Sequence, residues 1–280
     1  MAARRRRLDA ELVRRQLVAT RTLAQEAIAQ GLVTVDGAPA LKPSTQVRID
    51  QALHVAAAPR RFVSRGGEKL DHALEAFGVD PAGRHALDAG VSTGGFTDRL
   101  LQGGATRVLA YDVGYGQVHE RVRTDPRVIV RERTNVRELT PADIPAPPPD
   151  LLVADLSFIS LALVLPGLRA LLAPTAEAVV LVKPQFEVER GEVGAGGIVR
   201  DPALWRRALT RVAAAAATAD WEVHGATASP VLGAKGNVEF LLHLAGRPGV
   251  ADPVATLEVA VEEGMLRRAG REPAERRRSP

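Results

Sequence analysis

Apolar segments and helical segments alternate along the chain from His85 onward, and this alternation constrains the fold more than any other feature. The apolar segments predict strands at 85–89, 107–112, 127–131, 150–154, 177–182, 221–227 and 237–244. The other periodic segments predict helices at 66–77, 95–103, 116–123, 161–172 and 201–219. Parallel strands need a long connection, which is usually a helix. The chain is therefore expected to be an α/β protein with a mostly parallel, doubly wound sheet of seven strands.

Residues 1–60 are predicted to form a separate, smaller domain. Leu8 and Leu12 lie on one face of a predicted helix at 7–17, and Thr20 can cap a second helix that Gly31 ends. The stretches 33–37 and 46–55 alternate as strands do, and the first closes on an Asp-Gly turn. The predicted organisation is thus an α+β domain at 1–60, the α/β domain at 61–246 and a polar extension at 247–280, whose end is expected to be disordered.

Positive charge is concentrated in the first domain. Residues 1–60 contain ten Lys and Arg against five Asp and Glu, a net charge of +5, whereas the whole chain carries +4. Such an excess is typical of proteins that bind nucleic acid, and RNA stems are bound largely through their phosphates and shape. A solvated, arginine-rich N-terminus is the alternative explanation of the charge, and a generic helix-hairpin protein-interaction module is the alternative for the domain. The residues predicted to contact RNA are Arg4, Arg6, Arg7, Arg14, Arg15, Arg21, Lys42 and Arg65.

The composition argues against several other classes of protein. No run of eighteen apolar residues is present, so we expect no membrane span, and the basic start lacks the apolar region of a secretory signal. Cysteine is absent, and the six histidines form no HxH or HExxH motif. We therefore expect a cytoplasmic protein without disulfides and without a metal centre.

A glycine-rich turn follows the first predicted strand of the α/β domain, in LDAGVSTGGFTD at 87–98. Its GxxxGG spacing differs from the GxGxxG of dinucleotide-binding domains, and it has no Lys or Arg to meet a pyrophosphate. S-adenosylmethionine has no phosphate and carries a cationic sulfonium, so the turn favours it over NAD as the cofactor. Asp112, after the second strand, is expected to bind the ribose. The candidate cofactor-binding residues are Asp88, Gly90, Ser92, Thr93, Gly94, Gly95, Phe96, Thr97, Asp112, Glu132 and Asn135; helix capping is the alternative for the last two.

Two lysines and two carboxylates occupy four separate motifs at strand ends or helix starts. Asp155 ends the apolar run LLVAD and Lys183 ends AVVLVK, so both are expected at the carboxyl edge of the sheet, where such folds bind ligands. Lys69 lies in SRGGEKL and Glu239 in GNVEF. A lysine is costly to bury unless acids surround it. The four are therefore predicted to form one catalytic pocket, although an ordinary salt bridge is the alternative for each residue alone.

These residue types suit deprotonation of a ribose hydroxyl and its attack on a sulfonium methyl group. Lys183 is the predicted general base, because a desolvated lysine beside a second cation loses its proton more readily. Lys69 is expected to orient the hydroxyl and to supply that second cation. Asp155 and Glu239 would hold the lysines, and no metal is required.

The first domain is similar to the S4 RNA-binding domain. Its sequence RLDAELVRRQLVATRTLAQEAIAQGLVTVDG departs from the usual pattern at Gln16, in place of a glycine, and at Asp36, in place of an asparagine. With SRGGEKL, LDAGVSTGGFTD, YDVGYGQ, DLSFISL, LVKPQFE, GGIVRD and KGNVEF, the chain resembles the TlyA (haemolysin A-like) family, which joins an S4 domain to an FtsJ/RrmJ-type methyltransferase.

The resemblance implies a Rossmann-like, S-adenosylmethionine-dependent methyltransferase that modifies the 2′-oxygen of cytidine in ribosomal RNA, of the small subunit, the large subunit or both. It also implies that the family's Lys-Asp-Lys-Glu tetrad falls on Lys69, Asp155, Lys183 and Glu239. The expected partners are ribosomal RNA or ribosomal subunits and no membrane, while the oligomeric state stays open, with a monomer as the expectation.

Other interpretations remain open at this stage. The haemolysin label of the family suggests a membrane-active protein, but the chain has no long apolar stretch and no amphipathic helix with a strong aromatic face. A non-catalytic, ribosome-binding S4 protein and an RNA pseudouridine synthase are the further alternatives. Phe96, Phe158 and Phe186 could contact bases or belong to the core, and the glycine-rich loop at 191–201 could close over RNA or be a plain connection.

Overall fold

The computed structural model of the protein describes residues 5–18, 20–56, 61–246 and 249–276, with the backbone alone at 234 and 271–276. The chain divides into two compact units, Met1–Arg61 and Phe62–Pro280. This division lies one residue from the boundary expected between the first two domains. Arg4, a predicted RNA contact, lies outside the described residues.

Within its described residues, the first unit contains two short helices and two small sheets. Its elements are β1 (Arg5–Arg7), α1 (Leu8–Arg14), α2 (Arg21–Ala29), β2 (Val33–Val35), β3 (Ala38–Pro39), β4 (Gln46–Arg48) and β5 (Leu53–Val55). Thr20 caps α2 as predicted, because its side chain accepts a hydrogen bond from the amide of Leu23. The prediction of one strand over 46–55 is wrong: β4 pairs with β1, whereas β5 pairs with β2 in the other sheet.

Two buried carboxylates of α1, Asp9 and Glu11, bind four of the arginines predicted to contact RNA. The ion pairs are Arg7–Asp9 at 3.0 Å, Arg21–Asp9 at 2.9 Å, Arg14–Glu11 at 2.6 Å and Arg15–Glu11 at 2.8 Å. Hydrogen bonds from Arg7 and Arg14, respectively, hold the pKa of the two carboxyls well below their usual range. Arg15 also donates to the backbone carbonyls of Ile49 and Gln51, so we assign it to the fold rather than to RNA.

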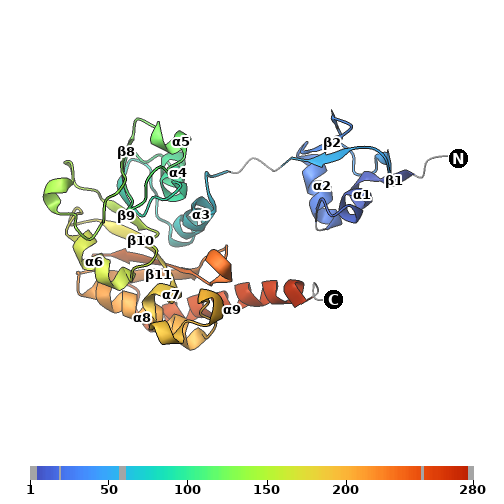
Figure 1. Ribbon diagram of the computed structural model, residues 1–280. Helices are drawn as coiled ribbons and strands as arrows, with labels where there is room; N and C mark the ends of the chain where they lie inside the picture. Colours follow the sequence, from blue (N-terminus) through green and yellow to red (C-terminus); the bar gives the residue numbers. More distant parts are fainter. Residues whose placement is uncertain (1–4, 19, 57–60, 247–248, 277–280) are drawn as a thin grey trace. The chain divides into compact units, whose positions relative to one another are not determined.

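The second unit contains one seven-stranded sheet and its helices (Figure 1). The strands are β6 (His85–Ala89), β7 (Arg107–Tyr111), β8 (Val128–Arg131), β9 (Leu151–Ala154), β10 (Glu177–Val182), β11 (Glu222–Ala228) and β12 (Phe240–Ala245). The α-helices are α3 (Arg65–Phe77), α4 (Gly95–Gln102), α5 (Glu120–Arg123), α6 (Leu161–Arg169), α7 (Pro184–Glu187), α8 (Pro202–Ala217) and α9 (Pro253–Arg276). All seven predicted strands are present, although the last begins at Phe240 rather than at 237.

The strand order is β11-β12-β10-β9-β6-β7-β8. Within this sheet β12 is antiparallel to both of its neighbours, and the paired strands from β10 to β8 are parallel. The carboxyl ends of β6, β7, β9 and β10 therefore meet at one edge. The direction in which the chain adds strands reverses at β6, and open α/β sheets bind ligands in the crevice at such a reversal.

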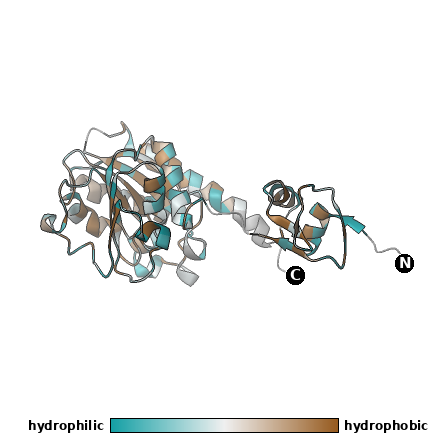
Figure 2. Ribbon diagram, turned by 90° about the horizontal axis from the view of Figure 1, so that it is seen from above, coloured by the Kyte–Doolittle hydropathy of each residue, from teal (hydrophilic) through white to brown (hydrophobic). Residues whose placement is uncertain are grey.

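Helices cover both faces of the sheet, because successive residues of each strand face opposite sides. Leu151 and Val153 of β9 pack in the cluster that contains α3 and α4, whereas Leu152 and Ala154 pack in the cluster that contains α6 and α8. Figure 2 shows these hydrophobic strands in the interior of the unit. Burial on both faces explains why the central strands β9 and β10 are continuous or nearly continuous apolar runs in the sequence.

Residues 247–280 were expected to be a polar extension, and most of this segment is helical. Residues 253–276 form α9, which packs against β11 and α8. Among the α9 side chains that the structure describes, Leu257, Ala260 and Val261 are buried in the core, whereas the apolar Val254, Val259, Met265 and Leu266 are exposed. The chain end expected to be disordered is helical as far as Arg276.

Candidate active site

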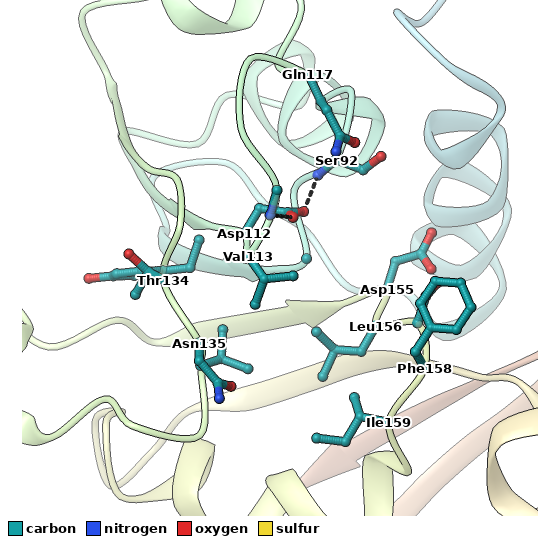
Figure 3. A pocket seen from close by; sticks show the side chains of 15 residues that line it. Ser92, Asp112, Val113, Gln117, Thr134, Asn135, Asp155, Leu156, Phe158 and Ile159 are labelled. Carbon is teal, nitrogen blue, oxygen red and sulfur yellow. Dashed lines mark hydrogen bonds between the residues drawn. The ribbon is translucent and has the colours of Figure 1, made fainter.

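A first cavity of about 320 Å³ opens at the carboxyl ends of β6, β7 and β9 (Figure 3). Its walls come from the glycine-rich turn after β6, the loop after β7 and the segment that follows β9. None of the side chains that line it is basic. The lining residues are Gly90, Ser92, Tyr111, Asp112, Val113, Gly114, Gln117, Thr134, Asn135, Val136, Asp155, Leu156, Ser157, Phe158 and Ile159.

Two residues shape this first cavity. Gly90 has φ +93°, and a β-carbon at this position would lie 2.6 Å from the carbonyl oxygen of Asp155, so a side chain would be both strained and obstructed. Asp112 accepts hydrogen bonds of 2.7 Å from the amides of Ser92 and Gly114, one on each carboxylate oxygen. A carboxylate oxygen has two lone pairs, so Asp112 can still accept from the hydroxyls of a ribose. The cavity therefore suits a neutral or cationic nucleoside without phosphates.

The structure separates the predicted cofactor-binding residues into three groups. Gly90, Ser92, Asp112 and Asn135 line the first cavity. Thr93, Gly95 and Phe96 line a smaller cavity of about 70 Å³ that shares Gly90, Ser92 and Asp155 with the first. Asp88, Gly94, Thr97 and Glu132 line neither of these two cavities.

Asp88 lies beneath the glycine-rich turn rather than against the first cavity. It is fully buried and accepts a 2.6 Å hydrogen bond from the Thr97 hydroxyl. Burial away from water raises the pKa of Asp88 to about 7, and the negative charges of Asp155 and Asp112 contribute to the rise. We infer that Asp88 supports the turn from below and does not contact a cofactor.

Because the folded state binds a proton at Asp88 more tightly than the unfolded chain does, ionisation of Asp88 favours unfolding. This contribution to stability is lost as the pH rises from about 4 through about 7. Between pH 5 and pH 8, the wild type should lose about 2–3 kcal/mol more unfolding free energy than Asp88→Asn, which cannot ionise. Both tryptophans, Trp205 and Trp221, are buried in the second unit, so tryptophan fluorescence during urea unfolding measures this effect. If the unfolding free energies of the two proteins change equally with pH, Asp88 does not titrate as described.

A second cavity of about 480 Å³ adjoins the first, since Ser157 and Phe158 line both. Two ion pairs border it: Lys69 Nζ lies 2.6 Å from Glu239 Oε2, and Lys183 Nζ lies 2.5 Å from Asp155 Oδ1. The structure thus brings together all four residues predicted as catalytic: Lys69, Lys183 and Glu239 line the second cavity, and Asp155 reaches Lys183 from the first. The remaining lining residues are Gln185, Phe186, Val193, Gly197, Lys235 and Asn237.

Strand and helix ends position these four side chains. Asp155 follows β9, Lys183 follows β10, Glu239 precedes β12, and Lys69 lies in the first turns of α3. Lys69, Lys183 and Glu239 are 8%, 9% and 2% exposed, so their charges interact with little screening by water. Gly233 makes room for the carboxylate, because a β-carbon there would lie 1.9 Å from Glu239 Oε1.

The glycine-rich loop at 191–201 forms a wall of the second cavity. Asn237, which is buried, donates to the carbonyl of Gly197 and accepts from the amide of Val199. These bonds of 2.8 and 3.0 Å tie the loop to the segment that carries Glu239. Sequence reasoning missed Asn237 as a site residue, although its position two residues before Glu239 was a usable signal.

The three phenylalanines differ in their surroundings. Phe96 is buried in the core between α3, α4 and the sheet, whereas Phe158 is 92% exposed with φ +65°. The rings of Phe158 and Phe186 lie 5.4 Å apart at the second cavity. Two aromatic faces are therefore available beside this cavity, and Phe96 belongs to the core.

The described residues include no group of three or more His, Asp or Glu side chains that could hold a metal ion. Across the same ranges, no helix has the length and apolar character needed to span a bilayer.

An S4 domain followed by an FtsJ-like methyltransferase domain defines the class of the protein: residues 6–53 match the S4 domain model and residues 62–245 match the FtsJ-like methyltransferase model. The 16S/23S rRNA (cytidine-2′-O)-methyltransferase TlyA of Mycobacterium tuberculosis is 52% identical over 264 residues, which cover 94% of this chain and 98% of that protein. The chain therefore belongs to the TlyA family and is a methyltransferase.

Two further relatives are named for haemolysis. Hemolysin A of Brachyspira hyodysenteriae is 36% identical over 85% of this chain and 98% of its own. A solved structure from Streptococcus thermophilus, described as a hemolysin, is 36% identical with a TM-score of 0.73 and covers 97% of this chain and 100% of that one.

Proposed function

We propose that the protein transfers a methyl group from S-adenosylmethionine to the 2′-oxygen of a cytidine in ribosomal RNA, in the small subunit, the large subunit or both. The observation that carries the proposal is the pairing of Lys183 with Asp155 and of Lys69 with Glu239 around the second cavity, beside a first cavity without basic residues. The ribosomal substrate is the one in the printed name of the M. tuberculosis relative. Such a substrate would place the protein in the cytoplasm.

The first cavity fits S-adenosylmethionine. Asp112 can accept from the ribose hydroxyls, Gly90 allows close approach of the backbone, and the absence of basic lining residues disfavours a pyrophosphate. When bound, S-adenosylmethionine supplies a methyl group that is activated by the positive charge of its sulfonium. The electrons of the carbon–sulfur bond stay on sulfur when the methyl group passes to oxygen. Asp155 lines the first cavity and contacts Lys183, which lines the second, so the reacting atoms are expected near this pair.

The two lysines have different roles toward the acceptor hydroxyl. In the proposed reaction Lys183, in its neutral form, accepts the proton of the ribose hydroxyl as the oxygen forms its bond to carbon. Lys69, held by Glu239, stabilises the negative charge that develops on that oxygen. Lys183 then releases the proton to water. Orientation in the two cavities contributes much of the acceleration, because the reacting groups no longer have to meet by diffusion.

The proposal is tested by incubating the full-length protein with ribosomal subunits and S-adenosylmethionine labelled in its methyl group. We expect label in the RNA fraction of at least one subunit, and calorimetric binding of S-adenosylmethionine without comparable binding of NAD. Cofactor binding together with unlabelled RNA from both subunits would contradict a ribosomal substrate.

The first unit is proposed to supply affinity for RNA. Arg6 and Lys42 form no ion pair with the residues that the structure describes, so both remain available for phosphates. Arg6→Ala and Lys42→Ala should each lower RNA affinity and reduce the slope of log affinity against log salt by about 1, with cofactor binding unchanged. Filter binding over a range of salt measures both quantities. Arg206→Ala, on α8 of the other unit, is the control; an equal change in that variant would show that the effect is not specific to the first unit.

A further inference from the structure

Ser157 is a polar residue shared by the two cavities, and it also contacts Lys183. Its hydroxyl accepts a 2.8 Å hydrogen bond from Lys183 Nζ, which lies 2.5 Å from Asp155 Oδ1 on another side. Sequence reasoning quoted the motif DLSFISL but did not select this residue. We propose that Ser157 is a positioning residue, which directs the unshared electron pair of Lys183 toward the acceptor hydroxyl. The inference rests on the proposed function, in which Lys183 is the base.

This role follows from the number of N–H groups on the lysine amine, because the groups that bind them determine where the lone pair points. A protonated lysine has three N–H donors, and the neutral amine that can accept a proton has two, with the lone pair in the third tetrahedral position. An ionised Asp155 can only accept, and the Ser157 hydroxyl has lone pairs that accept as well. When one N–H group of neutral Lys183 is hydrogen bonded to Ser157 and the other faces the Asp155 carboxylate, one direction is left for its lone pair.

That remaining direction is set by the surroundings of Lys183. The lysine lines the second cavity, is 9% exposed and has its two partners on the segment after β9. An acceptor hydroxyl in the second cavity therefore approaches the position that neither partner occupies. Without Ser157 the amine, with one N–H still facing Asp155, could place its lone pair in either of two staggered positions, and only one of them faces the acceptor.

The substitution Ser157→Ala tests the inference in the full-length protein. We expect the single-turnover rate of methyl transfer to fall about 3- to 30-fold, which corresponds to the loss of one oriented hydrogen bond. The KM for ribosomal subunits and the Kd for S-adenosylmethionine should stay unchanged, because Ser157 acts through Lys183. Ser157→Thr retains the hydroxyl at an exposed position and should recover most of the rate.

A double-mutant cycle separates this role from a general disturbance of the site. Adding Ser157→Ala to Lys183→Ala should lower the remaining rate no further, since the group that Ser157 positions is already absent. A wild-type rate for Ser157→Ala, or an equal loss in the presence and absence of Lys183, would overturn the inference. A near-normal rate for Lys183→Ala alone would instead overturn the assignment of the base, so the two failures are distinguishable.

Discussion

Replacement of Lys183 by alanine is expected to lower the single-turnover rate of methyl transfer by about 10²- to 10⁴-fold, the range that general base catalysis contributes. Lys183 lines the second cavity and not the first, so the affinity for S-adenosylmethionine should be nearly unchanged. Transfer of label to ribosomal subunits at saturating cofactor measures the rate, and calorimetry measures the affinity.

Lys183→Arg is the matched control for this experiment. Arginine keeps the positive charge beside Asp155 but stays protonated, so it cannot serve as a base. We expect this variant to be as inactive as the alanine variant. High activity of the arginine variant would assign Lys183 a purely electrostatic role, and near-normal activity of Lys183→Ala would exclude it as the base.

Replacement of Lys69 by alanine should affect both stability and activity. In the wild type, Lys69 Nζ lies 2.6 Å from the carboxylate of Glu239, which is 2% exposed. The substitution leaves this buried carboxylate without its ion-pair partner. Removal of one partner of a buried ion pair destabilises a protein by about 3–5 kcal/mol. Urea unfolding followed by the fluorescence of Trp205 and Trp221 reports the stability of this unit, and single-turnover transfer reports the activity.

A second substitution separates the two effects of Lys69. In the double variant Lys69→Ala/Glu239→Gln the uncompensated charge is gone, so most of the stability should return. The rate should remain low, because the acceptor oxygen still lacks its cation. Recovery of the rate along with the stability would mean that Lys69 only maintains the fold.

The sheet could be predicted from the sequence because its strands are buried on both faces. Runs such as Leu151–Ala154 and Glu177–Val182 are apolar throughout or nearly so, and they end at residues whose polarity changes abruptly. The catalytic candidates were predictable for the same reason, since Asp155 and Lys183 are the first charged residues after such runs. α9 escaped prediction because few of its described apolar side chains, namely Leu257, Ala260 and Val261, are buried in the core.

Which way a charged side chain faces was harder to predict. Asp88 lies inside β6, opposite Ala110, and is buried beneath the turn, whereas Asp112 follows the end of the neighbouring β7 and lines the first cavity. Composition and spacing do not distinguish these two environments. The sequence also did not show which arginines of the first unit form ion pairs within the domain and which are left for RNA. The spacing from Glu11 to Arg14 and Arg15 is that of side-chain pairs on a helix, so it was a usable signal for these two.

The position of the transferred methyl group tests the central claim most directly, namely that the paired lysines activate a ribose hydroxyl. RNA from each ribosomal subunit, treated with the protein and labelled S-adenosylmethionine, can be digested to nucleosides and analysed by mass spectrometry. We expect the label in 2′-O-methylcytidine, and no label in that nucleoside when Lys183→Ala replaces the wild type. Label on a base, or in a ribose whose modification does not depend on Lys183, would contradict the claim.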